Sequence, residues 1–195
     1  AIPAIIKGKD VLGIAPTGSG KTASYVLPLL TNLEDVSDKK NRYVKVLVLV
    51  PTRELAIQVN EVVKFFAPYV SHWIKSMAVY GGVSINPQMM GMNNVSFLVA
   101  TPGRLLELVE SNAVHLSEID TLVLDEADKM LNLGFKDEMT RIFELLPKKR
   151  QSRLFSAALS DKLENINQIL LRDPLVIKIE TEEENIDLIK QNGYF

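Results

Sequence analysis

Short runs of β-branched and other apolar residues recur along the chain, and each run is apolar at consecutive positions rather than at alternating ones. Strands buried on both faces show this pattern, because helices cover both sides of their sheet. The pattern predicts strands over residues 11–14, 46–50, 77–80, 97–100, 122–124, 154–155 and 175–179.

The segments between these runs carry apolar residues at helical spacing. They predict helices over residues 21–32, 54–66, 104–111, 136–145 and 161–170. Alternating strands and helices are typical of βαβ units, which build a parallel sheet. We therefore expect an α/β fold with a mostly parallel sheet flanked by helices on both faces.

Two polar segments interrupt this alternation. Residues 35–42 mix charges of both signs with turn-forming residues and predict a surface loop. Residues 180–195 are strongly acidic at their start and predict a linker or tail. The domain itself is thus expected to comprise residues 1–179.

Composition and charge narrow the class of protein. The chain has 195 residues, enough for one substantial domain, and it has no cysteine, which excludes a disulfide framework and a thiol nucleophile. Its longest apolar runs are far shorter than the roughly 20 residues that span a bilayer, so we expect no membrane partner. Without a leader or cysteine, we expect an intracellular protein, in the cytoplasm or the nucleus.

The formal net charge of −2 is unevenly distributed. Residues 180–195 hold five acids and one lysine, and residues 1–179 therefore carry a net charge of +2. The acidic total does not exclude nucleic acid as a partner, but any nucleic acid must be bound by a few well-placed groups.

A glycine-rich segment follows the first predicted strand and opens the first predicted helix. Such a loop directs its N–H groups at phosphate oxygens, and the helix adds its positive end. The lysine would reach the β- and γ-phosphates, and the last hydroxyl would ligate Mg²⁺. A strict Walker A loop begins with glycine, whereas this chain has alanine at that position. The alternative interpretation of the whole segment is a glycine-rich surface turn. The residues are Ala15, Pro16, Thr17, Gly18, Ser19, Gly20, Lys21 and Thr22.

Two carboxylates, Asp125 and Glu126, end a buried predicted strand. A parallel strand delivers them to the same sheet edge as the phosphate loop. Asp125 is predicted to hold Mg²⁺ and Glu126 to orient the water that attacks a phosphate. The alternative is a strand that ends in a solvated acidic turn.

Three more predicted strands end in turns that suit a phosphate backbone. Hydroxyls, main-chain amides and arginines at these turns can bind phosphates without reading bases. The alternative is a set of ordinary helix caps whose arginines pair with nearby glutamates. The residues are Pro51, Thr52 and Arg53, then Gly81 and Gly82, then Thr101, Pro102, Gly103 and Arg104.

Residues 125–135 (DEADKMLNLGF) resemble the signature of the DEAD-box RNA helicases. Other segments match that family in its order, over about residues 1–180. Residues 15–22 match motif I, 51–56 match motif Ia, 81–82 match the glycine doublet, 101–104 match the next RNA-binding motif, and 156–158 lie at motif III.

The resemblance implies the N-terminal RecA-like domain, a P-loop NTPase fold, of an ATP-dependent RNA helicase. It implies ATP and Mg²⁺ as cofactors, with Lys21 and Glu126 catalytic and with Asp128 and Ser156 coupling the nucleotide to RNA. It implies a sequence-independent grip on the RNA backbone by the three turns. The partner would be a second RecA-like domain of the same protein, which supplies an arginine finger, and we expect a monomer.

The chain departs from the family pattern in three ways. The family's adenine-reading glutamine would fall ahead of Ala1, and the second domain would follow the acidic segment. At motif III the family has Ser-Ala-Thr, whereas this chain has Ala158 in place of the threonine. Because Ser156 keeps its hydroxyl, we expect it to hydrogen-bond toward Asp128. Without the arginine finger that the resemblance assigns to the second domain, the chain alone is expected to hydrolyse ATP weakly.

Two alternative functions stay open. One is a helicase-derived RNA-binding or regulatory module that does not unwind, which Ala158 favours. The other is a DNA-directed P-loop ATPase, which would bind DNA at least as well as RNA.

Overall fold

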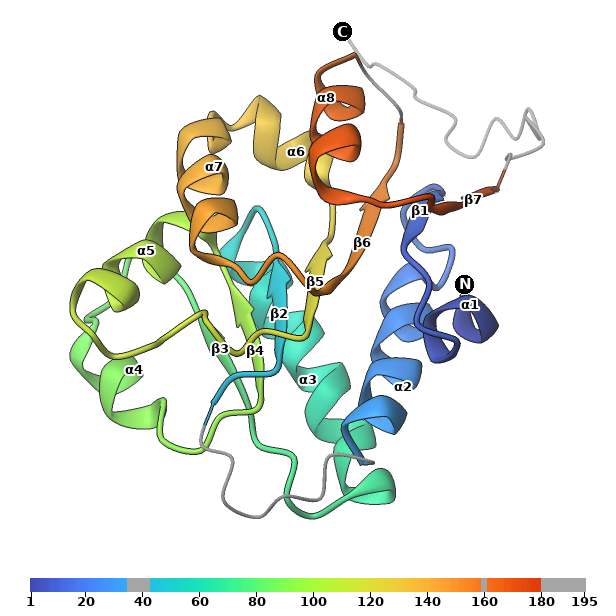
Figure 1. Cartoon of the computed structure of the whole chain (residues 1–195). Helices are drawn as coiled ribbons and strands as arrows, with labels where there is room; N and C mark the ends of the chain where they lie inside the picture. Colours follow the sequence, from blue (N-terminus) through green and yellow to red (C-terminus); the bar gives the residue numbers. More distant parts are fainter. Residues whose placement is uncertain (35–42, 159–160, 180–195) are drawn as a thin grey trace, which may run out of the picture.

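One parallel sheet forms the centre of the molecule (Figure 1). The computed structural model describes residues 1–34, 43–158 and 161–179. Over this part of the chain seven strands pair in the order β3-β4-β2-β5-β6-β1-β7, and every pairing is parallel. The strands are β1 Val11–Ile14, β2 Val46–Leu49, β3 Ser76–Val79, β4 Phe97–Ala100, β5 Thr121–Leu124, β6 Gln151–Ser156 and β7 Leu175–Lys178.

Helices connect the strands and cover both faces of the sheet (Figure 1). Parallel neighbours cannot be joined by a tight turn, so each connection crosses a face of the sheet. The helices are α1 Ile2–Ile6, α2 Lys21–Glu34, α3 Arg53–Val70, α4 Asn86–Gly91, α5 Pro102–Glu110, α6 Ala127–Asn132, α7 Lys136–Leu145 and α8 Asp161–Leu170.

The alternating side chains of each strand divide the core into two layers. Leu47 and Leu122 pack on one face with residues from α5, α6, α7 and α8. Val48 and Val123 pack on the other face with residues from α1, α2 and α3. The period of two along a strand thus explains why the runs are apolar throughout, since each face has its own helical layer.

The predicted α/β fold is confirmed, and the sheet is parallel at every pairing. All seven predicted strands are present within a few residues of their expected bounds. Three short helices, α1, α4 and α6, were not predicted, because five or six residues are too few to establish a helical period. Helix α3 runs on to Val70 through Pro68, beyond the predicted end at residue 66.

The predicted loop at 35–42 and the acidic segment at 180–195 lie outside the described residues. Among the residues that are described, no helix is both long enough and apolar enough to cross a membrane.

Candidate functional site

The phosphate loop lies at the carboxyl end of β1, and α2 begins at its lysine. Gly18 and Gly20 have φ angles of 83° and 82°, in the left-handed region that disfavours any residue with a Cβ. A Cβ built on either glycine would meet no atom within 4 Å. The glycines are therefore needed for the path of the backbone, and the space in front of the loop is open.

Lys21 and Ala15 close the loop on itself. The Lys21 Nζ donates a hydrogen bond to the Ala15 carbonyl oxygen at 2.8 Å. The Ala15 N–H donates to the Ser156 carbonyl oxygen at 3.0 Å, which joins the start of the loop to the end of β6. A phosphate is a stronger acceptor for an ammonium group than a neutral carbonyl, so this lysine is placed to exchange one for the other.

Asp125 follows β5 and is only 2% exposed. Its Oδ2 accepts a hydrogen bond from the buried Tyr25 hydroxyl on α2 at 2.8 Å. Its Oδ1 is buried and has no hydrogen-bond partner among the described residues. A buried carboxylate oxygen without a donor fits a hard cation such as Mg²⁺, which takes oxygen ligands.

The pKa values at this contact keep the proton on the phenol. Burial raises the pKa of Asp125, while the hydrogen bond from Tyr25 and the charge of Lys21 act in the opposite direction. Burial, followed by the adjacent Asp125 carboxylate, raises the pKa of Tyr25 well above its usual value. Tyr25 is therefore a fixed donor that orients one oxygen of Asp125. This pair was not predicted from the sequence, because 100 positions separate the two residues.

Glu126 adopts a left-handed backbone conformation, with φ 52° and ψ 48°. Its Oε2 forms an ion pair with the Lys129 Nζ at 2.9 Å. Non-glycine residues in this region cost free energy and are concentrated at functional sites. The chain turns sharply here, and the two neighbouring carboxylates have different partners: Asp125 is buried against Tyr25, and Glu126 pairs with Lys129.

The expected contact from Ser156 toward Asp128 is not present, which corrects our interpretation. The Ser156 hydroxyl instead donates to the Ala158 carbonyl oxygen at 2.7 Å. The Asp128 Oδ1 is buried and has no partner within the described residues. Position 158 is an alanine and carries no side-chain hydroxyl.

A second group of predicted residues lies where β2, β3 and β4 end. Thr52 caps α3, because its Oγ1 accepts a hydrogen bond from the Leu55 N–H at 3.3 Å. Arg53 is exposed, and its guanidinium carbon lies 5.0 Å from the centre of the Tyr80 ring. This distance is typical of a cation–π contact, so the motif Ia arginine rests on the residue that precedes the glycine doublet.

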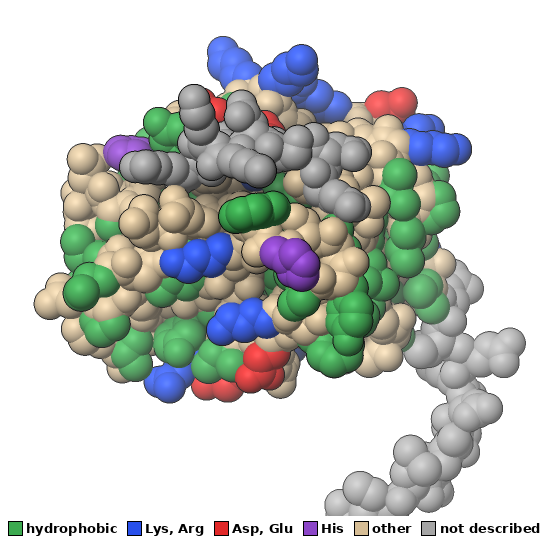
Figure 2. All heavy atoms as spheres, turned by 90° about the horizontal axis from the view of Figure 1, so that it is seen from below, with side chains coloured by type: hydrophobic (Ala, Val, Ile, Leu, Met, Phe, Trp, Pro, Cys, Tyr) green, Lys and Arg blue, Asp and Glu red, His purple; other side chains and the backbone are tan. Residues whose placement is uncertain are grey.

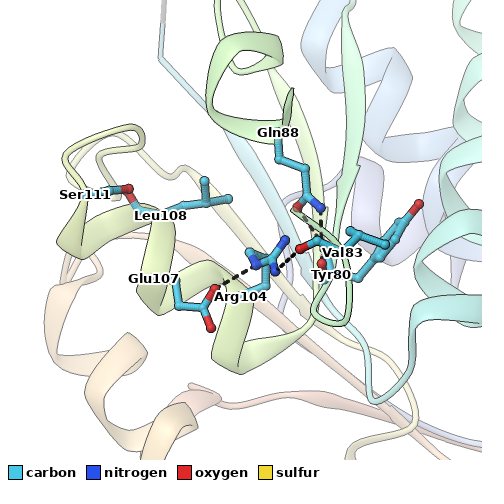
Figure 3. Close-up of polar contacts among 7 residues, drawn as sticks. All are labelled: Tyr80, Val83, Gln88, Arg104, Glu107, Leu108 and Ser111. Atoms are coloured by element: carbon cyan, nitrogen blue, oxygen red, sulfur yellow. Dashed lines mark hydrogen bonds and ion pairs between the residues drawn. The ribbon is translucent and has the colours of Figure 1, made fainter. Parts of the chain in front are cut away.

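Arg104 is turned inward, contrary to the expectation of a guanidinium at the mouth of its turn (Figure 3). It is 6% exposed; its Nε donates to the Glu107 Oε2 at 2.8 Å, and its Nη2 donates to the Val83 carbonyl oxygen at 2.7 Å. For Arg104 the structure thus shows the pairing with a nearby glutamate that was the alternative interpretation. The other residues of this turn, Thr101, Pro102 and Gly103, stand where β4 leads into α5.

Gln88 on α4 is a further polar residue of this region that the sequence did not reveal. Its Nε2 donates to the Tyr80 carbonyl oxygen and its Oε1 accepts from the Tyr80 N–H, both at 3.1 Å (Figure 3). The side chain therefore pairs with Tyr80 as a neighbouring strand would. No sequence period marks it, because α4 is six residues long.

The strand order sorts these residues into two groups on one sheet edge. The neighbours β5, β6 and β1 carry the two carboxylates, Ser156 and the phosphate loop, while the neighbours β3, β4 and β2 carry the three turns. In parallel sheets, ligands bind beyond the carboxyl ends of the strands. We call the first group the phosphate side and the second group the turn side.

The opposite edge, where the strands begin, has a different character. Lys and Arg side chains are scattered there among acidic and apolar ones (Figure 2). Lys45, just before β2, lies within 3.3 Å of Glu118 and 3.5 Å of Asp120. Arg153 of β6 is 1% exposed, and burial lowers its pKa to about 10 although Asp10 raises it. Lys45 and Arg153 at this edge thus have partners within the fold.

Comparisons with known proteins agree with this geometry. Residues 1–166 match the family described as DEAD/DEAH box helicase. The chain belongs to this family. It is 40% identical over 191 residues to the ATP-dependent RNA helicase CshA of Listeria monocytogenes, and the match covers 97% of this chain and 36% of the relative. It is 37% identical to the ATP-dependent RNA helicase DeaD of Haemophilus influenzae, over 100% of this chain and 31% of that protein.

A solved DEAD box protein, from the hyperthermophile Methanococcus jannaschii, has the same fold. Its TM-score is 0.83 at 33% sequence identity, and the match covers 92% of this chain and 48% of that one. The DEAD/DEAH box domain described here therefore spans about a third of the length of the two helicases above and about half of the solved protein.

Proposed function

We propose that this chain is the ATP-binding domain of an ATP-dependent RNA helicase, with ATP and Mg²⁺ on the phosphate side and the RNA backbone on the turn side. One observation carries the proposal: the buried Asp125 Oδ1, which has no hydrogen-bond partner among the described residues, lies on the same sheet edge as an open phosphate loop. A buried carboxylate oxygen that accepts no hydrogen bond is unfavourable, and a bound cation would compensate it.

Each residue of the phosphate side has a distinct role in the proposal. Lys21 and the loop amides, with the segment from Ala15 to Thr22, bind the phosphates. Thr22 and Asp125 hold Mg²⁺, which when bound neutralises charge on the β- and γ-phosphate oxygens. Tyr25 keeps Asp125 oriented, and Glu126 positions the attacking water.

On the turn side, the proposal assigns contacts to the RNA backbone and not to the bases. Arg53 is exposed, and Gly81 and Gly82 are exposed as well. Thr52 and Thr101 each stand at the start of a helix, where main-chain N–H groups attract phosphates. Ser156 ends β6 and Asp128 lies on α6, just after β5, both on the phosphate side, and they would relay the state of the nucleotide to the turn side.

Complete activity requires a second RecA-like domain of the same protein in this proposal. The chain spans about a third of the helicases it resembles, and an arginine finger supplied by another domain accelerates such hydrolysis by about 10³–10⁵. We therefore expect the 195-residue chain to bind nucleotide but to turn over slowly.

Fluorescence titration of the chain with a labelled ATP analogue, with and without Mg²⁺, tests the nucleotide site. We expect binding that Mg²⁺ strengthens, and little ATP hydrolysis even with RNA. Binding that is indifferent to Mg²⁺, or rapid RNA-stimulated hydrolysis by these residues alone, would contradict the proposal. Competition between RNA and DNA strands of the same sequence separates it from a DNA-directed ATPase, which predicts equal or better DNA binding.

A regulatory module without unwinding activity is the second candidate, because the Ser156 hydroxyl bonds to Ala158 and not to Asp128. The substitution Ala158→Thr in a protein that contains both domains distinguishes the two. A gain of strand separation would support an uncoupled module, whereas unchanged unwinding would favour the helicase.

A further inference from the structure

The segment that carries the glycine doublet is held at both of its ends by buried side chains. Gln88 pairs with both main-chain polar groups of Tyr80, at the start of the segment. Arg104 donates to the carbonyl oxygen of Val83, at the end of the segment (Figure 3). The two side chains come from different helices, α4 and α5, and we call residues 80–83 the doublet loop.

Between these two anchors, the doublet loop presents main chain to the solvent. Gly81 and Gly82 are exposed, and a Cβ on either would meet no atom within 4 Å. Gly82 has a φ of 78°, which a residue with a Cβ rarely adopts. Within the described part of the chain, the N–H groups of both glycines have no hydrogen-bond partner. Two free donors on an exposed, open surface suit an anionic oxygen.

We propose that Gln88 and Arg104 are positioning residues for RNA: they fix the doublet loop so that the Gly81 and Gly82 N–H groups face a backbone phosphate. Neither side chain touches the RNA. This inference rests on the proposed function, because it specifies how the turn side of that domain is made ready for its ligand.

The effect of Gln88 extends beyond the glycines. Gln88 fixes the main chain of Tyr80, and the centre of the Tyr80 ring lies 5.0 Å from the guanidinium carbon of Arg53. One buried amide is thereby connected to two of the three turns, motif Ia and the glycine doublet. A series of neighbouring phosphate contacts matches a nucleic-acid strand better than a single small anion.

The geometry of both anchors makes close substitutes informative. Arg104 reaches Glu107 and Val83 through two nitrogens of one planar, rigid group, whereas lysine would have to reach both from a single atom at the tip of a flexible chain. In Gln88→Glu, one carboxylate oxygen still accepts from the Tyr80 N–H, but the other faces the Tyr80 carbonyl oxygen without a proton to share. Each substitution releases one end of the doublet loop with little change in side-chain size.

The test compares Gln88→Glu and Arg104→Lys with the unmodified chain. The control is Arg141→Lys, an exposed arginine on α7 that is paired with Glu110 and lies outside the doublet loop. A single-stranded oligouridylate is titrated while the Gly81 and Gly82 amide resonances and the RNA affinity are followed. Nucleotide affinity and melting temperature are measured in parallel, because a general structural defect would change them too.

We expect RNA to shift both glycine amide resonances in the unmodified chain. Each of the two variants should bind RNA about five- to tenfold more weakly, since the loop must then be ordered on binding. Nucleotide affinity should be unchanged in both variants. The salt dependence of RNA binding should be unchanged in Arg104→Lys, because that substitution keeps the charge and no phosphate contact by a charge is lost. The control should bind RNA like the unmodified chain.

Three outcomes would overturn the inference while the proposed function stands. The first two are glycine amide resonances that do not respond to bound RNA, and variants that bind RNA normally. The third is an Arg104→Met variant in which the salt slope of RNA binding falls by about one, because that change indicates a direct phosphate contact. If Arg104→Lys fails to fold, Gln88→Glu on the other helix tests the same loop. An unmodified chain that binds nucleotide but no RNA would instead contradict the proposed function.

Discussion

The two groups of site residues on the same sheet edge differ in how many of their polar side-chain atoms have hydrogen-bond partners within the protein. On the phosphate side, Asp125 and Asp128 each have a buried oxygen without a partner among the described residues, and Lys21 bonds to a neutral carbonyl of its own loop. On the turn side, Thr52 and Gln88 are bonded to main chain, and Arg104 lacks a partner only at Nη1. The first region is incomplete without a ligand, whereas the second is already built.

The difference follows from the two ligands. A nucleotide brings a metal and a dense charge, so it can supply partners that a buried carboxylate lacks. A nucleic-acid backbone is bound at an exposed surface, where salt weakens the contacts made by charged side chains. There, a rigid main chain limits the entropy that is lost on binding. Single substitutions should therefore change nucleotide binding and RNA binding separately.

The largest effect is expected for Glu126→Gln, measured in a protein that also contains the second domain. Loss of the carboxylate removes the group that positions water, so kcat should fall by about 10²–10⁴ while nucleotide and RNA affinities stay near their original values. Steady-state ATPase assays and equilibrium binding measure the two separately. An equal loss of nucleotide affinity would show that Glu126 holds the ligand and not the water.

The substitution Lys21→Ala should affect the phosphate side alone. Removing a charged donor from the phosphates should weaken nucleotide binding by roughly 10- to 150-fold, the equivalent of one charged hydrogen bond. RNA binding should not change, because Lys21 belongs to the phosphate side and the proposed RNA contacts belong to the turn side. Parallel titrations with a fluorescent nucleotide and with labelled RNA test this, and a matching loss of RNA affinity would argue against two independent regions.

Tyr25→Phe should produce an intermediate effect. The ring keeps its packing against Phe155, 5.2 Å away, but Asp125 loses the donor at 2.8 Å. Residues that orient a metal ligand typically contribute about tenfold in metal affinity, so more Mg²⁺ should be needed for tight nucleotide binding. Tyr69→Phe, at an exposed position on α3, is the matched control. An unchanged Mg²⁺ requirement would assign Tyr25 to packing only.

The smallest effect concerns stability without ligand. Because burial raises the pKa of Asp125, its ionisation opposes folding at neutral pH, and this opposition disappears as the pH falls toward the usual value of 3.8. Asp125→Asn should therefore raise the melting temperature in EDTA at pH 7 by about 2–4 °C, which corresponds to about 1 kcal/mol in a domain of this size. This difference in melting temperature should shrink in acid. Thermal melts of both proteins at several pH values test this, and a difference that stays constant or has the opposite sign would contradict it.

The sequence predicted the strands and the segments at their ends well, for a physical reason. A strand buried on both faces must be apolar throughout, and a phosphate loop must place glycines where the backbone turns left-handed, as Gly18 and Gly20 do. These demands act on neighbouring residues, so they are visible in a single chain.

Contacts between distant segments were not visible in this way. Tyr25 reads as a core aromatic of a helix until the fold brings it to Asp125. Arg104 reads as a surface arginine beside a turn, and only the position of Val83, 21 residues earlier, explains its burial. Gln88 belongs to a helix too short to show a period. The sequence therefore predicted the location of the site better than the hydrogen bonds that its side chains form.

The left-handed turn at Glu126 implies a trade-off between stability and activity. A glycine at this position would relieve about 1–3 kcal/mol of backbone strain, so a chain shaped by stability alone would carry glycine there. Glutamate at this position keeps a carboxylate beside Asp125 at the expense of folding free energy. The domain should therefore become more thermostable, and inert, through the single change Glu126→Gly.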